Sequence, residues 1–180
     1  MTTETETERS GASRGAADQK MLRRIYLNDH RAGAAGAVAM LGRMIESNAG
    51  TPLGETLTGV LHEIEEDIEA LETVMRQLGA TSNPVKNLGA KLGERIGRLK
   101  MNGRLRGYSP LSRVLELEGL MAAIDMKRRA WETLQTVAGS DRIGDVDLAR
   151  YMRRADSQRE RLRSHHEEAV ALAFGQIDRS

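Results

Sequence analysis

Apolar residues between positions 57 and 78 recur at alternating spacings of four and three. The set is Leu57, Leu61, Ile64, Ile68, Leu71, Met75 and Leu78. This spacing places their side chains along one face of an α-helix. The other faces are acidic, and no lysine or arginine occurs between Arg43 and Arg76. The pattern therefore predicts a strongly amphipathic, acidic helix whose apolar stripe packs against partner helices.

Helix boundaries are indicated by prolines and glycines. Each of the three prolines follows a residue that commonly caps a helix N-terminus, in the pairs Thr51-Pro52, Asn83-Pro84 and Ser109-Pro110. Such a cap with proline at the first helical position is a start signal. Glycine typically ends a helix, which suits Gly79 and Gly139. With two further periodic segments, these signals predict helices at 17–47, 52–78, 84–104, 110–138 and 146–175.

The first predicted helix carries unusually small side chains in its middle. Residues 30–42 read HRAGAAGAVAMLG, with three glycines and five alanines. Glycine destabilises a helix interior by about 1 kcal/mol relative to alanine. We therefore expect close packing of another element against this surface to offset that loss.

The helix lengths predict the topology. Four helices of this size are each about 40 to 45 Å long at 1.5 Å per residue. Short connections make antiparallel hairpins of the first pair and of the last pair. The connection over residues 79–109 is long enough to travel the length of the bundle. We expect an all-α, four-helix bundle at residues 17–180, preceded by a disordered acidic tail at residues 1–16.

Composition supports this fold class and excludes some functions. Charged residues make up 29% of the 180 residues and aromatic residues only 3%, a balance typical of an all-α protein. The net charge is +1, so attraction of anions has to be local. The chain has no cysteine for disulfides, thiolate chemistry or a cysteine zinc site. No apolar run approaches the ~20 residues of a membrane span. The polar N-terminus lacks the features of a signal peptide, so we expect a cytoplasmic protein.

Three stretches carry a resemblance to a known class of proteins. They are RIYLNDHRA at 24–32, HEIEEDIEALETVMRQLGATSNPVK at 62–86 and LSRVLELEGLMAAIDMKRRAWETL at 111–134. The first two resemble the first hairpin of bacterial ferritin-like proteins, especially a stress-associated ferritin-like family, and the third resembles the third bundle helix. YLNDH, RLKMNGRL and YSPLSR also resemble uncharacterised actinobacterial proteins. The resemblance implies two hairpins joined by a long crossover.

A working ferritin-like di-metal site needs a Glu from two helices and Glu-x-x-His from the other two, all facing inward. The second predicted helix has Glu63-Ile64-Glu65-Glu66, with Glu where the His should be. At about 100° per residue, only Asp67 borders the core of that helix. The last helix places Gln158, Arg159, Leu162 and His166 inward. We therefore expect a degenerate metal site with no cofactor, with bound iron or manganese as the alternative.

Five polar residues are expected at or near the core: Asp29, His30, Asp67, Gln158 and His166. One interpretation is a hydrogen-bonded core layer, in which Asp29 and His30 meet Gln158, Arg159 or Arg128. The other is an altered metal or ligand site in the same place. Of the adjacent rings of His165 and His166, one is expected at the core edge and the other in water.

The connection between the two hairpins is basic. Its candidate binding residues for an anionic partner are Lys86, Lys91, Arg95, Arg98, Lys100, Arg104 and Arg106, against the single acid Glu94. Leu88, Leu92 and Ile96 form an apolar ridge beside glycines spaced by four, which allows close helix approach. In one interpretation the ridge lies on the bundle and the basic residues neutralise the acidic second helix. In the other, this basic amphipathic helix binds nucleic acid, lipid head groups or an acidic protein.

The sequence shows no nucleophile elbow, phosphate-binding loop or dinucleotide-binding turn. Our first hypothesis is a non-enzymatic ferritin-like protein that interacts with a protein partner or a second copy, in a stress-related role by resemblance. The second is a metal-binding or oxidoreductase bundle with an altered ligand set around Asp29. The third is peripheral association with anionic membrane or nucleic acid through residues 86–106.

Overall fold

The computed structural model describes residues 3–80 and 108–175 of the chain. These residues form four helices and one small hairpin of strands. The elements are α1 (Thr3–Ser47), α2 (Pro52–Gln77), α4 (Pro110–Ala138), β1 (Arg142–Ile143), β2 (Val146–Asp147) and α5 (Leu148–Phe174). The predicted all-α class is confirmed for this part of the chain. The predicted helix 84–104 lies outside the described residues.

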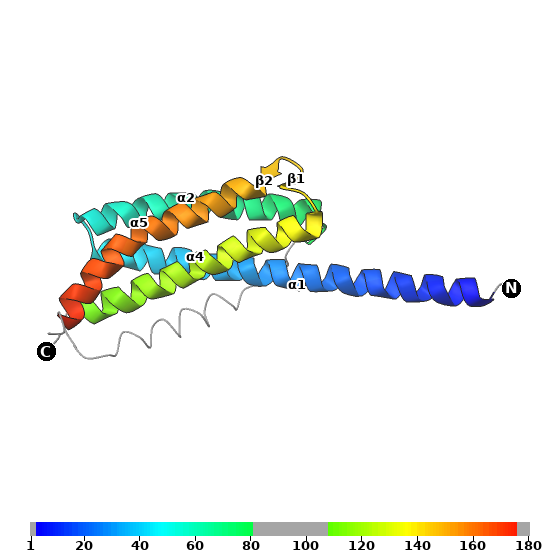
Figure 1. Cartoon of the computed structure of the whole chain (residues 1–180), viewed down its shortest axis with the longest axis horizontal. Coiled ribbons are helices and arrows are strands. Elements are labelled where there is room, and N and C mark those ends of the chain that lie inside the picture. Colours follow the sequence, from blue (N-terminus) through cyan, green and yellow to red (C-terminus); the bar gives the residue numbers. More distant parts are fainter. Residues whose placement is uncertain (1–2, 81–107, 176–180) are drawn as a thin grey trace, which may run out of the picture.

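The helices are arranged as two antiparallel hairpins, α1 with α2 and α4 with α5 (Figure 1). Helix α1 also packs against α4, whereas α2 and α5 approach each other less closely. Helices α2 and α4 run in the same direction, so the end of α2 and the start of α4 lie at opposite ends of the bundle (Figure 1). Residues 81–107 therefore have to connect two ends of the molecule.

The predicted helix starts at residues 52 and 110 are confirmed. The Thr51 hydroxyl accepts a hydrogen bond from the Gly54 amide, and the Ser109 hydroxyl accepts one from the Ser112 amide, each over 3.1 Å. These bonds satisfy amides that have no partner within the helix. At the other ends, Gly79 and Gly139 both have φ of 61°, the left-handed conformation that favours glycine at a helix stop.

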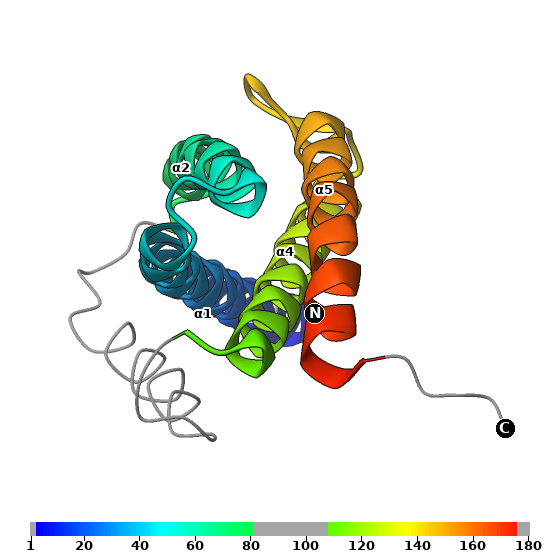
Figure 2. The ribbon, with the colours of Figure 1, turned by 90° about the vertical axis from the view of Figure 1, so that its left-hand side faces the viewer.

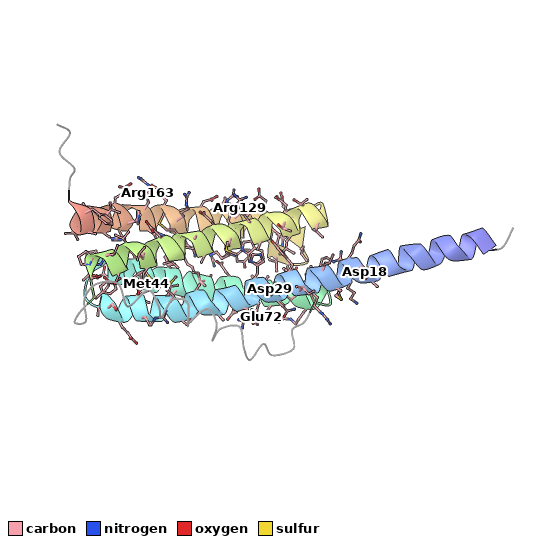
Figure 3. All side chains as sticks on the ribbon, turned by 90° about the horizontal axis from the view of Figure 1, so that it is seen from below. Asp18, Asp29, Met44, Glu72, Arg129 and Arg163 are labelled. Carbon is pink, nitrogen blue, oxygen red and sulfur yellow. The ribbon has the colours of Figure 1, made fainter. Side chains whose placement is uncertain are left out.

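Helix α1 begins earlier than the sequence pattern predicts. It starts at Thr3, within the segment expected as a disordered tail, instead of near residue 17. Residues 3–16 contain no proline and only two glycines, so no strong helix breaker separates them from the rest of α1. From near Asp18 towards its N-terminus, α1 extends past the end of the bundle (Figure 3).

The inward face of α2 is rotated from the predicted stripe. Leu57 and Ile64 are buried as expected, but Leu61 and Ile68 are only partly buried. The buried line instead passes through Val60, Asp67 and Val74, which share the same three- and four-residue spacing. In this orientation of α2 the Asp67 carboxylate contacts cationic side chains from α4 and α5.

The connection between α4 and α5 contains a hairpin that the sequence analysis did not predict. Strands β1 and β2 pair antiparallel, with Ile143 opposite Val146, around a turn at Gly144, whose φ is 55°. A Gly-Asp pair between β-branched residues is a hairpin signal that could have revealed it. The buried Val146 and the fully buried Leu148 then close one end of the core.

Candidate functional site

Three polar residues occupy positions in the buried stripes of three different helices. Asp67 on α2 is 2% exposed, Gln158 on α5 is fully buried, and the Lys127 side chain on α4 is 17% exposed. Asp67 lies between Ile64 and Leu71 along the stripe of α2, which belong to two separate clusters of the hydrophobic core. The polar residues therefore form a layer between these clusters.

Lys127 is the centre of this layer. Its ammonium group donates to Asp67 Oδ2 and to Gln158 Oε1, each over 2.5 Å. A lysine on α4 thus joins an acid on α2 to an amide on α5. Because both partners are buried, these bonds are not screened by bulk water.

Arginines from α5 complete the arrangement. Arg154 donates from Nη1 to Asp67 Oδ1 over 3.0 Å and to the Glu63 carbonyl over 3.2 Å, and its Nη2 lies 2.7 Å from Glu66 Oε2. Glu63 Oε2 accepts from Gln158 Nε2 over 2.9 Å and from Arg161 Nη2 over 2.5 Å. We call this set the ion network. Its members are Glu63, Glu66, Asp67, Lys127, Arg154, Gln158 and Arg161.

Formal charges cancel within the ion network, since it contains three acids and three bases. Burial raises the pKa of Asp67 above its ordinary value, although attraction to Lys127 and Arg154 lowers it in part. Burial also lowers the pKa of Lys127, opposed by the nearby Asp67 charge. Both directions have the same cause, because removing the two charges from water outweighs their mutual attraction. The pair is therefore a weak source of stability and a strong constraint on geometry.

The five residues predicted as a polar core or ligand cluster fall at different places. The structure brings Asp67 and Gln158 together through Lys127. Asp29 is exposed on α1 (Figure 3). His30 is half-buried with its ring 4.5 Å from the Tyr26 ring, and burial lowers its pKa. His166 lies apart from the network, 3.3 Å from Glu118.

Other expected positions can also be compared with the structure. Arg159 was expected inward but has a 56% exposed side chain that lies 3.3 Å from Asp125. Arg128, a predicted neighbour of Asp29, instead donates to Asp156 over 2.8 Å. The seven basic residues from Lys86 to Arg106 lie outside the described residues.

Sequence reasoning missed Lys127 and Arg154. The buried stripe of α4 runs through Leu117, Leu120, Ile124, Trp131 and Leu134. A lysine at 127 continues its spacing of three and four, so a charge at a core position was the available signal. Arg154 gave no such signal, because it is next to the stripe and reaches inward through its long side chain.

The donor set does not fit a di-metal centre. The ion network offers carboxylates and an amide but no histidine, and each of its acids is within salt-bridge distance of a lysine or arginine. Among residues 3–80 and 108–175, no group of three or more His, Cys, Asp or Glu side chains could hold a metal ion. The predicted lack of a metal cofactor for the whole chain stays a prediction.

Comparisons with protein-family models, curated proteins and solved structures find no match for this chain. No helix in the described part of the chain is long and apolar enough to cross a membrane.

Proposed function

We propose that this chain is a ferritin-like helical-bundle protein that works by binding a partner and not by catalysis at a di-iron centre. The observation that carries the proposal is the position of Lys127 between Asp67 and Gln158. A ferritin-like protein binds its metal ions with inward-facing acids and histidines from its bundle helices. Here an ammonium group already neutralises and hydrogen-bonds the inward-facing acid.

The arrangement of helices supports the ferritin-like part of the proposal. Two antiparallel hairpins with parallel α2 and α4 need a connection that travels along the bundle (Figure 1). Such a single crossover is the connectivity of ferritin-like folds. The stress-related role implied by the sequence resemblance belongs to the same proposal.

Electrostatics supports the non-catalytic part. A divalent ion placed at Asp67 would meet the positive charges of Lys127 and Arg154 within a few ångströms of the carboxylate. Like charges at such distances repel strongly in a partly buried site. Metal binding would therefore require Lys127 to lose its proton or to leave the layer, which opposes tight binding.

Elemental analysis of protein purified without chelator from metal-supplemented cultures tests this proposal. We expect far less than one equivalent of iron, manganese or zinc per chain. The Asp67→Asn variant serves as the matched comparison, because it removes the central carboxylate and keeps its size. One or two equivalents in the natural protein, lost in the variant, would overturn the proposal and favour a metal-binding or oxidoreductase function.

The charge pattern of residues 86–106 favours a phosphate-bearing partner. An excess of seven basic residues over one acid is typical of a segment that contacts phosphate groups through charge. Titration with phosphatidylglycerol vesicles and, separately, with a DNA duplex distinguishes the two sources of phosphate. We expect binding that weakens with added salt and is lost when Lys91, Arg95 and Arg98 are changed to Gln. If the protein binds neither the vesicles nor the DNA duplex at low salt, a phosphate-bearing partner is contradicted.

A further inference from the structure

Apolar side chains are exposed on one side of the pair formed by α1 and α4. Of the seven large apolar side chains that are exposed in the described residues, five belong to these two helices. Seen along the bundle, α2 lies next to α1 and α5 next to α4, and no described helix covers the remaining side of the pair (Figure 2). Exposed apolar side chains that gather on one surface often mark an interaction site.

Two contacts fix the register of the antiparallel helices α1 and α4. The Tyr26 hydroxyl donates to Thr133 Oγ1 over 3.2 Å. Met40 Sδ lies 3.9 Å from the position that a Cβ on Gly119 would take. The two residue numbers have the same sum in both pairs, so that sum identifies further residues at equal levels. Such pairs are Leu22 with Val137, Asp29 with Ala130, and Gly33 with Met126.

These residues share one side of each helix. At about 100° per residue, Leu22, Asp29 and Gly33 on α1 point within about 40° of one another. Met126 and Val137 on α4 point within about 20° of each other. The apolar residues on this side have exposed fractions between 47 and 62%. We call the surface formed by Leu22, Ile25, Asp29, Met126, Arg129 and Val137 the α1–α4 face.

Two opposite charges lie in the middle of the α1–α4 face. Asp29 on α1 and Arg129 on α4 are both exposed, and they lie at nearly the same level because Arg129 adjoins Ala130 (Figure 3). Within the described part of the chain, neither residue forms a salt bridge. The face therefore has apolar ends, with one acid from α1 and one base from α4 between them.

This arrangement is complementary to itself. In a two-fold dimer, the commonest closed oligomer, the same surface of both copies forms the contact. A two-fold axis parallel to the helices would place α1 of each copy against α4 of the other at the same level. Asp29 would then face Arg129 twice, and Leu22 would face Val137 twice. An axis perpendicular to the helices at that level would instead bring the two Asp29 carboxylates together.

We propose that a second copy of this chain docks on the α1–α4 face, about a two-fold axis parallel to the helices, with an Asp29–Arg129 pair on each side of the axis. The projecting part of α1 suits this axis, because both copies would project from the same end of the dimer. Residues 15–25 are all exposed in one copy, and most protein helices depend on tertiary packing for their stability. The dimer gives this stretch a neighbouring helix. The docking does not depend on the proposed function, which concerns metal binding and residues 86–106.

Cross-linking between chains tests the contact, since the natural chain contains no cysteine. Gly33→Cys and Met126→Cys are made in separate chains, so that no link can form within one chain. A Cβ at Gly33 would meet no atom within 4 Å, and Met126 is exposed, so both positions accept the change. We expect a short bismaleimide to link the two chains when they are mixed. In the control, the similarly exposed Leu172→Cys near the far end of α5 replaces Met126→Cys and should not be linked.

Charge reversal tests which residues form the pair. Asp29→Arg and Arg129→Asp each bring like charges together twice, so each should weaken dimerisation at least about tenfold. A mixture of the two variants should dimerise again, because the two bases of one variant then face the two acids of the other. Sedimentation equilibrium of the full-length chain measures the dissociation constants. Arg153→Asp, at an exposed arginine of α5, is the matched control and should leave the dissociation constant unchanged.

A natural protein that sediments only as a monomer, even in concentrated solution, would overturn the proposal. So would a control pair that is linked as fast as the Gly33→Cys and Met126→Cys pair. A dimer that neither charge reversal weakens, or reversal variants that fail to dimerise when mixed, would place the contact on another surface and also overturn it. None of these results changes the expected metal content, so the proposed function is tested separately.

Discussion

Replacing Lys127 with methionine tests the central contact of the ion network. Methionine has a similar length but carries no charge and cannot donate a hydrogen bond. Asp67 Oδ2 and Gln158 Oε1 would both lose the ammonium group that now lies 2.5 Å away. Arg154 would remain the only cation of the network bonded to Asp67, through Oδ1.

The expected loss follows from these contacts. Removing one member of a buried ion pair typically costs about 3 to 5 kcal/mol, because the other charge stays buried without compensation. Arg154 still compensates Asp67 in part, which places the expected loss near the lower end, at about 3 kcal/mol. For a chain of this size, such a loss lowers Tm by about 6 to 12 °C. The adjacent Arg128→Met change should cost less than about 1 kcal/mol, because the ion pairs that Arg128 forms with Glu132 and Asp156 lie at the surface.

Urea unfolding followed by tryptophan fluorescence measures these free energies. Trp131 is the only tryptophan, is 2% exposed and lies one helical turn from Lys127. The double variant Lys127→Met/Asp67→Asn should be more stable than the sum of the two single losses implies, by about 1 to 3 kcal/mol. If Lys127→Met costs no more than Arg128→Met, or if the two single losses simply add, then Lys127 and Asp67 do not form a desolvated pair.

Two further outcomes are expected. Burial raises the folded-state pKa of Asp67 above 3.8, so the folded protein binds a proton there more tightly than the unfolded chain does. The unfolding free energy of the natural protein, measured relative to that of Asp67→Asn, should therefore rise as pH falls through the raised pKa. A difference between the two proteins that stays constant in urea melts from pH 7 to pH 4 would contradict a raised pKa for Asp67. Leu57→Ala should lower the unfolding free energy by about 2 to 5 kcal/mol, because Leu57 is fully buried. Glu69→Ala, at an exposed position, should change it by no more than about 0.5 kcal/mol. Similar losses for both variants in thermal melts would mean that a different face of α2 points inward.

The fold could be predicted from local signals. Helix caps and helix-ending glycines act within one helical turn, so their effect can be predicted from the sequence alone. Examples are the caps Thr51 and Ser109 and the glycines Gly79 and Gly139. The rotation of α2 could not, because two apolar lines are available on that helix. One contains Leu61 and Ile68, and the other contains Val60 and Val74. The choice between them depends on partners from other helices, which local periodicity does not contain.

The candidate site shows the same division. Asp67 and Gln158 could be selected because polar residues next to an apolar stripe stand out in the sequence. Their connection could not be predicted, since it passes through Lys127, which is 60 residues from Asp67 and 31 from Gln158. The expectation that Asp29 would join them required α1 to present residue 29 to the core. Instead α1 presents Leu27, and Asp29 stays exposed.

The position of the ion network suggests why charged residues are kept in the interior. Helices α2 and α5 approach each other less closely than the helices within either hairpin, so long side chains are well suited to bridge them. Arg154 and Arg161 reach from α5 to acids on α2, and Lys127 reaches both helices from α4. Apolar packing tolerates sliding of one helix along another, whereas a bond between a particular cation and a particular carboxylate fixes the axial register. The network thus costs desolvation energy, and in return it aligns the second hairpin on the first, a specificity role known for some buried polar groups.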